Sequence, residues 1–301
     1  MQPKSNKKVI TRRDFLKTSG YAAAGSLLGL PLLDRTVAQA AVKSRVVLIR
    51  DSDVVDSQGR VNETVLESML DQAVTTLLGA PNPLSAWQKL FRPGDVVGIK
   101  SNVWSRLPTP EALEKALVFR LQQVGVNSNN IAVDDRGIRE NPVFMRSTAL
   151  INVRPMRTHH WSGLGTLLKN YIMFVPAPWK YHGNACERLG AIWQKSQLAG
   201  KTRLNILVML TPLFHGIGPH HYSSRYLWPY AGLIVSTDPV AADATGARII
   251  EAKRNAFFGG SRPISPPPLH IAAADTQFSL GYASPERIEL IRMGWGDQIL
   301  I

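Results

Sequence analysis

The chain has 301 residues, of which 45% are hydrophobic and 19% are charged, so it is long enough and apolar enough to bury a full core. Disordered chains, collagen-like chains and small disulfide scaffolds are excluded by this length and composition. Basic residues outnumber acidic residues by 35 to 22, which gives a net charge of +13, and the single cysteine, Cys186, excludes an internal disulfide and any zinc site or iron–sulfur cluster held by four cysteines.

Residues 1–40 contain the parts of a secretory signal in the usual order. Lysines come first, Arg12 and Arg13 are followed by Phe-Leu-Lys, a weakly apolar stretch covers residues 21–33, and a small-residue cleavage site ends at Ala40. The paired arginines resemble the twin-arginine signal, which the translocase reads as an address and which does not anchor the protein. We therefore expect cleavage near Ala40 and a periplasmic or otherwise exported protein without a stable membrane anchor. The alternative is an amphipathic helix that stays on the chain.

The predicted export route bears on cofactors and partners. The twin-arginine resemblance implies folding before export, and a common reason for this order is a cofactor inserted in the cytoplasm. Residues 1–40 hold seven basic and two acidic residues, so five of the thirteen positive charges belong to this segment. A periplasmic location excludes nucleic acid as the natural partner, and the remaining positive charge favours a small anion or an acidic surface.

Apolar segments alternate with helical patterns in the first half of the chain. Residues 62–78 have apolar side chains at helical spacing, and a helix over 109–123 begins with Pro110 in its first turn. A loop containing Pro81 and Pro83 separates the first helix from the next strand. Short strands are predicted over residues 45–50, 95–100, 131–133 and 149–153.

The second half repeats this alternation. Helices are predicted near residues 165–170 and 185–197, strands over 204–210 and 232–236, and a helix to about Lys253 that Thr237 or Asp238 caps. Strands without polar alternation, separated by helices, indicate an α/β fold with mostly parallel sheets covered by helices. The sheets could form two α/β lobes, 41–155 and 156–301, with the site between them. Ligands of such folds bind beyond the carboxyl ends of the strands.

Polar residues follow two of the predicted strands. Asn102 and Arg106 lie in the turn after strand 95–100, directly before a helix, and an arginine there can bind a carboxylate or phosphate with two parallel hydrogen bonds. The alternative is a solvated loop arginine. Asp135 follows strand 131–133 and is a further candidate for the site.

A denser polar cluster follows strand 149–153. Glycines directly before a helix let the backbone approach a ligand, and the amides of the first helical turn favour an anion. The segment is no Walker loop, because no Gly-Lys-Ser/Thr closes it. Its candidate site residues are Arg157, His159, His160, Gly163, Gly165 and Lys169.

Six of the seven histidines lie between residues 159 and 221, which favours metal binding or acid–base chemistry. His182 and His215 are the candidate metal ligands, although glycine and proline around His215 are equally typical of a surface loop. Asp243 lies one turn inside the helix that Asp238 caps, so capping does not explain it, and it is a weaker candidate.

The order of three segments, 94–102, 157–170 and 236–243, resembles that of the domain-of-unknown-function family 362. The resemblance extends over essentially the whole chain after residue 40. Some members of that family carry ferredoxin-like cysteine motifs, which this chain lacks. The family name itself assigns no reaction.

A fainter resemblance connects the chain with lactate racemase and its relatives, which use a nickel-pincer nucleotide. Residues 101–108 are similar to their Ser-Asp-x-Thr-Arg-Pro-x-Pro motif, with Asn102 in place of the aspartate, and the spacing from His159 to Lys169 is also similar. The resemblance implies that Lys169 holds the cofactor, that His159 transfers protons and that His182 binds nickel. The racemases carry a second catalytic histidine where this chain has Asp135. Either Asp135 takes that place or the chemistry is one-sided, such as dehydrogenation or elimination.

These observations predict a cofactor- or metal-dependent enzyme, of the racemase/epimerase or oxidoreductase type, that acts on a small anionic hydroxylated substrate. The alternative is a periplasmic module that binds an anion without catalysis. The cofactor would be a nickel-pincer nucleotide or a divalent metal, with no iron–sulfur cluster. The predicted roles are catalysis for His159, His160 and Asp135, substrate binding for Asn102, Arg106 and Arg157, cofactor binding for Gly163, Gly165 and Lys169, and metal binding for His182 and His215.

Overall fold

A computed structural model describes residues 43–216 and 221–301. The predicted export signal therefore lies outside the described residues, as does His220. Each strand predicted from the sequence is present, and two are clearly longer than predicted: β4 continues beyond Val153 to His159, and β6 extends from Thr202 to Leu213. The strands are β1 (Ser44–Arg50), β2 (Val97–Lys100), β3 (Ile131–Asp134), β4 (Ala149–His159), β5 (Gly163–Gly165), β6 (Thr202–Leu213), β7 (Gly232–Ser236) and β8 (Ile288–Gly294).

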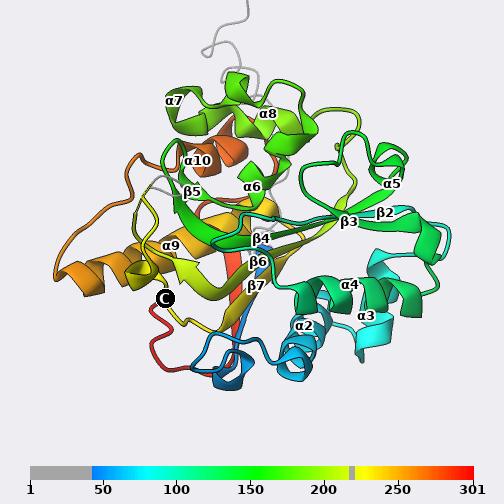
Figure 1. Cartoon of the computed structure of the whole chain (residues 1–301), viewed down its shortest axis with the longest axis horizontal. Helices are drawn as coiled ribbons and strands as arrows, with labels where there is room; N and C mark the ends of the chain where they lie inside the picture. The colour runs from blue at the N-terminus through cyan, green and yellow to red at the C-terminus, as the bar shows by residue number, and fades with distance from the viewer. Residues whose placement is uncertain (1–42, 217–220) are drawn as a thin grey trace, which may run out of the picture. The chain divides into compact units, whose positions relative to one another are not determined.

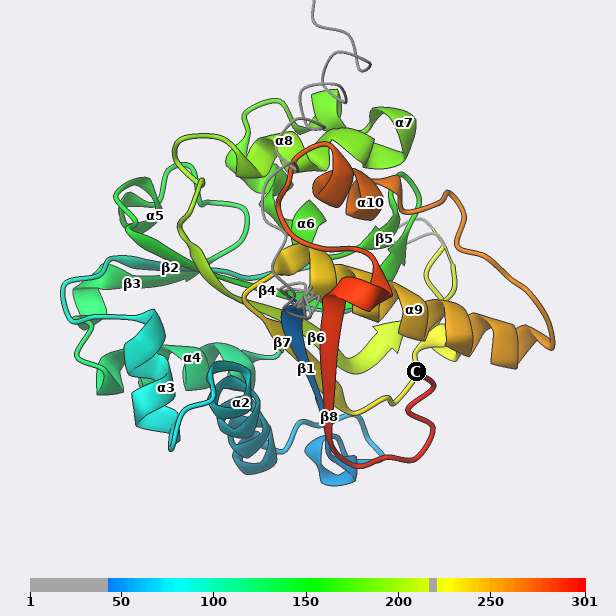
Figure 2. The ribbon, with the colours of Figure 1, turned by 180° about the vertical axis from the view of Figure 1, so that it is seen from behind.

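The described strands form one mixed sheet in the order β3-β2-β4-β6-β7-β1-β8, with β5 paired to β4 (Figure 1). The pairs β2–β3, β2–β4, β4–β6 and β1–β8 are parallel, whereas β7 is antiparallel to both neighbours. Figure 2 shows β1 and β8 side by side, although they come from opposite ends of the described chain. The predicted α/β class is confirmed, and strands from both sides of residue 155 share this sheet.

Helices cover both faces of the sheet. On one side, which we call the core face, α2, α3 and α4 share one apolar core with strand residues such as Val97, Val153 and Ile206. On the other side, the site face, α6 packs on β4 and β6, α9 packs on β1, β6 and β7, and α10 packs on α9 (Figure 1). The helices are α2 (Glu63–Leu78), α3 (Pro83–Leu90), α4 (Glu111–Gln123), α5 (Pro142–Met145), α6 (Leu167–Asn170), α7 (Gly183–Cys186), α8 (Gly190–Trp193), α9 (Pro239–Phe258) and α10 (Leu269–Thr276).

Local capping explains where the longer helices begin and end. Asn62 caps α2, Asp238 caps α9, and Gly79 ends α2 in the left-handed region at φ +55°. The segment around Pro83 was predicted to be a loop, which is wrong: Asn82 caps α3, and Pro83 occupies its first turn, where proline is tolerated.

The predicted helix over 185–197 is interrupted. Asn184, Ala185 and Cys186 have φ values of 44°, 50° and 63°, which an α-helix cannot contain, so short helical turns replace the predicted helix.

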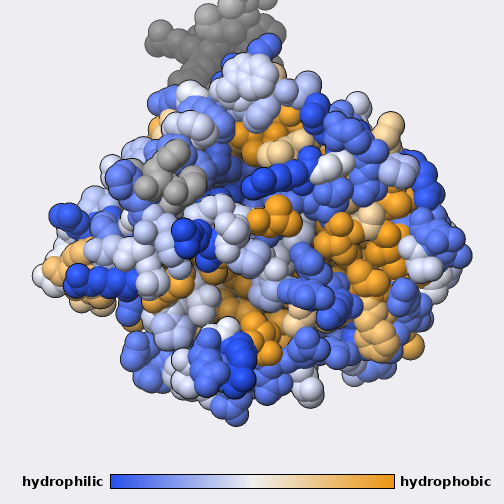
Figure 3. Space-filling view, viewed as in Figure 1, coloured by the Kyte–Doolittle hydropathy of each residue, from blue (hydrophilic) through white to orange (hydrophobic). Residues whose placement is uncertain are grey.

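Figure 3 shows hydrophobic surface gathered around α4, where Phe119 is 46% exposed. Within the described residues, every helix is too short or too polar to cross a lipid bilayer.

Candidate functional site

An irregularity in β4 brings three basic side chains to one cavity. The register between β4 and β6 shifts between Pro155 and Arg157, so the usual alternation of faces is interrupted there. Pro155 has no N–H to donate to a sheet, so it is compatible with a break in the hydrogen bonding between β4 and β6 at this point. As a result Arg154, Arg157 and His159 all line the same cavity.

This cavity, which we call the basic cavity, has a volume of about 270 Å³ and lies beyond the carboxyl ends of β2 and β3. Polar residues from five segments of the chain meet in it. Its polar lining consists of Asn102, Asp135, Arg136, Arg154, Arg157, His159, Lys169, Asn170 and His182.

Arg154 and Arg157 are buried next to each other. Both lie against Gly165, where an added Cβ would stand 3.1 Å from Nη2 of Arg154 and 3.5 Å from Cζ of Arg157. Nε of Arg154, and Nε and Nη1 of Arg157, have no hydrogen-bond partner among the described residues. The Arg157 guanidinium lies 4.3 Å from the centre of the Trp104 ring. Two guanidinium groups with free donors therefore face the cavity.

Burial lowers the pKa of both guanidinium groups. Burial lowers the pKa of Arg154 to about 10, against the attraction of Asp135 and Asp243. Burial lowers the pKa of Arg157 well below its ordinary value, and the charge of Arg154 adds to this effect. Because a guanidinium keeps its proton in proteins, the unfavourable burial of charge remains until an anion compensates it.

A buried ion pair forms the floor of the site. Nζ of Lys100 donates to Oδ1 of Asp135, to the carbonyl of Ser101 at 2.7 Å and to Oδ1 of Asn170 at 3.3 Å. Burial alone would raise the pKa of Asp135, but the charge of Lys100 outweighs it and lowers that pKa. Burial lowers the pKa of Lys100 to about 8 despite Asp135.

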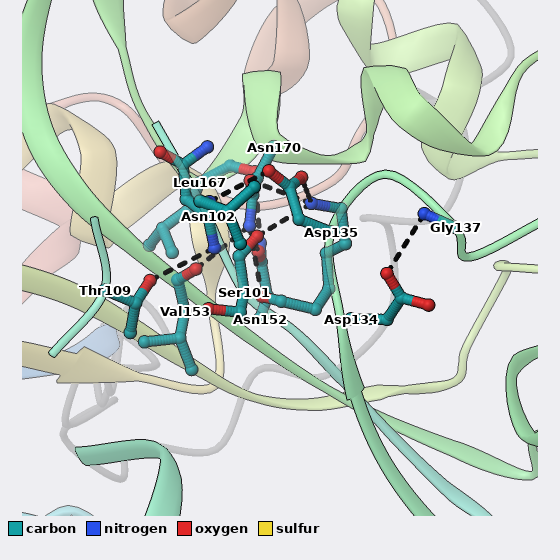
Figure 4. A network of polar contacts seen from close by, with 12 residues as sticks. Ser101, Asn102, Thr109, Asp134, Asp135, Gly137, Asn152, Val153, Leu167 and Asn170 are labelled. Carbon is teal, nitrogen blue, oxygen red and sulfur yellow. Dashed lines mark hydrogen bonds and ion pairs between the residues drawn. The ribbon is translucent and has the colours of Figure 1, made fainter. Parts of the chain in front are cut away.

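Asparagine side chains connect this pair to β4 and β6. Nδ2 of Asn170 donates to Oδ1 of Asn152 at 2.9 Å and to the carbonyls of Val153 and Lys100, and Nδ2 of Asn152 donates to the carbonyl of Leu167 at 3.0 Å. Figure 4 shows this network closing around Asn170 at the end of α6. Lys100, Asn152 and Asn170 therefore fix α6 to the sheet.

The two neighbouring carboxylates after β3 point in different directions. Asp135 points into the network and also accepts the backbone N–H of Val103 at 3.0 Å, whereas Asp134 points away and accepts the N–H of Gly137 (Figure 4). Asp135 thus lines the basic cavity, but both of its oxygens already have partners. We place it as a positioning residue for Lys100.

The amides that were expected to bind an external anion are occupied by the protein itself. Asp243, from α9, accepts the N–H of Leu167 at 3.0 Å and that of Leu168 at 2.9 Å. Burial raises the pKa of Asp243 to about 7, against these hydrogen bonds. Gly163 belongs to a hairpin strand and has φ +69°, and Gly165 gives space to the arginines, so in the described structure both glycines serve packing.

Lys169 faces the cavity from α6. It is 3% exposed, and its Nζ lies 3.5 Å from Sγ of the buried thiol of Cys186. Burial lowers the pKa of Lys169 to about 8 in spite of Cys186, and the charge of Arg154 lowers it further. Burial raises the pKa of Cys186, so the thiol keeps its proton.

The histidines of the cavity are neutral. Burial lowers the pKa of His159 far below its ordinary value, and the charges of Lys169 and Arg157 lower it further. The N–H of Trp161 donates to Nδ1 of His159 at 3.2 Å, so the ring proton must lie on Nε2. The ring of His160 stacks on that of His159 with centroids 4.7 Å apart. Burial lowers the pKa of His182 to about 4, and the charge of Lys169 adds to the effect.

Arg106 and His215, two of the predicted site residues, line other cavities. Arg106 is exposed and lines a separate, mainly apolar cavity of about 330 Å³ with Pro155 and Val208. His215 lines a third cavity, and its Nδ1 lies 2.9 Å from Nη1 of Arg254. The structure therefore does not bring Arg106 or His215 to the basic cavity.

The structure does not bring the two predicted metal ligands together. His182 and His215 line different cavities, and among residues 43–216 and 221–301 no group of three or more His, Cys, Asp or Glu side chains could hold a metal ion. Four of the nine polar residues that line the basic cavity are cationic, and such groups repel a metal cation. We derive no step through a metal or a nickel-pincer nucleotide.

Several site residues were missed from the sequence. Lys100, Asn152 and Cys186 contact the site, but none was predicted to. Arg154 belongs to the basic cluster predicted after strand 149–153, but it was given no role there. A lysine closing an otherwise apolar buried strand was the signal that could have identified Lys100.

Comparison with known proteins gives one family. Neither the curated proteins nor the solved structures gave a match. Residues 127–248 match the model of the family described as Domain of unknown function (DUF362). The matched range includes β3, β4, α6, β6 and the first half of α9, and hence Asp135, Arg154, Arg157, Lys169 and Asp243, but it begins after Lys100 and Asn102. The match covers less than half of the chain and supports a relation to the DUF362 family over residues 127–248.

Proposed function

We propose that this protein is an enzyme that binds a small anionic, hydroxylated substrate in the basic cavity and transfers a proton at that substrate. The observation that carries the proposal is the pair of buried guanidinium groups, Arg154 and Arg157, with nitrogen atoms that lack partners among the described residues. Leaving buried charged donors unpaired is strongly unfavourable, so a site that does so is built for an anion. Oδ1 of Asn102 is buried and also lacks a partner in that set, which supports a hydroxyl on the substrate.

Lys169 is our candidate for the proton-transferring group. Its pKa of about 8 gives a useful neutral fraction near neutral pH, as a general base requires. His159 carries its proton on Nε2 and can donate a hydrogen bond, but it cannot take a proton there. The proposed reaction is of the isomerase type: Lys169 removes the proton from the carbon that carries the substrate hydroxyl, and the proton is then returned to that carbon.

The test combines a measurement of anion binding with a measurement of hydrogen–deuterium exchange at the carbon atoms of the bound anion. Sulfate, phosphate, lactate, malate and glycerol phosphate are each titrated, and each organic anion is incubated with the full chain in deuterium oxide while deuterium incorporation at carbon is followed by NMR. We expect incorporation for at least one organic anion and none with Lys169→Arg, which keeps the positive charge. In the free protein the rate should rise towards pH 8 as Lys169 loses its proton, while anion affinity falls.

The second candidate is an anion-binding module without catalysis. The partners already held by Asp135 favour it, because no carboxylate in the described cavity is free to act as a base. Anion binding without deuterium incorporation or any other product would support this candidate over the enzyme. Export through residues 1–40 stays a separate proposal, tested by fractionating cells that express the chain with and without Arg12→Lys and Arg13→Lys.

A further inference from the structure

The charges around the basic cavity do not balance. The buried cations are Lys100, Arg154, Arg157 and Lys169, whereas the buried carboxylates near them are Asp135 and Asp243. Asp135 is paired with Lys100, and Asp243 is already bound to two backbone amides of α6. At least two positive charges are therefore uncompensated within the described residues. A ligand with a single negative charge would leave one of them unpaired in a buried site.

The excess positive charge of the basic cavity is concentrated at two neighbouring side chains. Arg154 and Arg157 both lie against Gly165, and their free nitrogens belong to neighbouring guanidinium groups. Two separate carboxylates would need two separate positive sites, whereas adjacent guanidinium groups suit one compact anion with several oxygen atoms. A phosphoryl group has nearly two charges near neutral pH and three acceptor oxygens on one centre.

We propose that the basic cavity recognises a doubly charged tetrahedral oxyanion, such as the phosphoryl group of a small phosphate monoester, held between Arg154 and Arg157. Lys169 lies on the same cavity and, as the proposed base, is not counted among the charges that hold the oxyanion. This inference rests on the proposed function for the location of the substrate and names the class of anion. It assigns the substrate as a phosphorylated hydroxy compound rather than a simple hydroxy acid.

The experiment is a calorimetric titration of the full chain at constant ionic strength. Sulfate, inorganic phosphate and glycerol phosphate are compared with acetate, lactate and succinate. We expect the tetrahedral dianions to bind at least about tenfold more tightly than acetate or lactate, the effect of roughly one charged hydrogen bond. Glycerol phosphate should bind at least as tightly as sulfate if the cavity also holds the group that carries the phosphoryl.

Comparing sulfate and glycerol phosphate at different pH values shows whether the second negative charge of the anion contributes to binding. Sulfate keeps both charges between pH 5 and 7, whereas a phosphate monoester loses one near pH 6. Glycerol phosphate should therefore weaken relative to sulfate as the pH falls. An unchanged ratio of the two affinities would contradict recognition of a dianion.

Substitutions of single arginines show which side chains bind the oxyanion. Arg157→Met should lower sulfate affinity at least about tenfold, and Arg157→Lys should restore part of it, because one charge returns without the fork of donors. Arg106→Met is the matched control, since Arg106 lies at a different cavity, and it should leave sulfate affinity unchanged. Circular dichroism of each variant checks folding, and Arg157→Lys keeps the test decisive if Arg157→Met does not fold.

The outcomes separate the two proposals. If no anion binds, both the proposed function and this inference fail. If acetate, lactate or succinate binds as tightly as sulfate, the cavity is an anion site but not one for a tetrahedral dianion, so only this inference fails. If Arg106→Met abolishes binding and Arg157→Met does not, the oxyanion lies elsewhere and the inference is wrong.

Discussion

The two faces of the sheet are made by the same strands and have opposite characters. On the core face, β2, β4 and β6 present residues such as Ile99, Val153 and Ile206, and all three are buried under α2, α3 and α4. One residue away along each strand, the site face presents Lys100, Arg154 and Asn205, which are also buried. Because successive side chains of a strand point to opposite faces, one strand can serve a dry core and a charged site at once.

The comparison separates the source of stability from the site of binding. Apolar burial on the core face stabilises the fold without any partner. The site face instead buries charges that stabilise the fold only when each has a partner. Substitutions on the core face should therefore change stability alone, and those on the site face should change stability, anion binding or both.

The largest expected effect comes from breaking the buried ion pair on the site face. Asp135→Asn leaves Lys100 without its carboxylate and should lower the free energy of unfolding by about 3 kcal/mol or more, measured by urea denaturation. Asp134→Asn is the matched control, because its carboxylate points away from the site, and it should lose about 1 kcal/mol. Equal losses would mean that the pair with Lys100 contributes no more than an ordinary hydrogen bond.

A large-to-small substitution on the core face tests the separation itself. Ile206→Ala removes a fully buried side chain from β6 and should lower the free energy of unfolding by about 3 kcal/mol, with sulfate affinity unchanged. Its neighbour Leu207 points to the site face and packs near Gly246 of α9, so Leu207→Ala should lower stability by a similar amount and also weaken sulfate binding. Loss of sulfate binding in Ile206→Ala would contradict the division into two faces.

Asp243 should give the site face its own pH dependence. Its pKa is raised from 3.8 to about 7 by burial, so the folded form keeps a proton that the unfolded chain has already lost. Stability should therefore fall as pH rises from about 4 to 7, by up to about 1.4 kcal/mol per pH unit. Asp243→Asn should flatten this dependence in urea denaturation curves recorded across that range. An identical slope in both proteins would show that Asp243 is ionised throughout.

The smallest expected effect is at the glycine between the arginines. Gly165→Ala would place a Cβ 3.1 Å from Nη2 of Arg154 and 3.3 Å from Cγ of Arg157, so the guanidinium groups must shift by a few tenths of an ångström. We expect a few-fold loss of sulfate affinity and a change in unfolding free energy below about 1 kcal/mol. Gly183→Ala, which would meet no atom within 4 Å, is the control and should be neutral for binding.

Elements with strong local signals were predictable. The apolar strands, the Asn62-capped α2 and the Asp238-capped α9 follow from short-range patterns that do not depend on distant residues. Two elements near the carboxyl end, α10 and β8, were not predicted, and β8 carries charged residues such as Glu289 and Arg292 that mask a strand pattern. Charged residues were also the reason that the second half of β4 was taken for a loop.

The candidate site was predictable in part. Arg157, His159 and Lys169 were expected at one strand end, and they do line one cavity with Asp135 and Asn102. The roles of Arg106 and His215 at a shared site were not supported by their positions. The helix amides expected to bind an external anion are bound by Asp243, whose carboxylate lies 75 residues further along the chain from Leu168.

The sequence by itself determined the α/β class, most strands and helices, and the collection of basic residues after the fourth strand, because each depends on neighbouring residues. Only the tertiary structure decided which of these residues share a cavity. The register shift of β4 against β6 turns Arg154, Arg157 and His159 towards one another, and the carboxylate of α9 occupies the amides of α6. Pairing partners and packing partners distant in the chain set these directions, and a local pattern does not contain them.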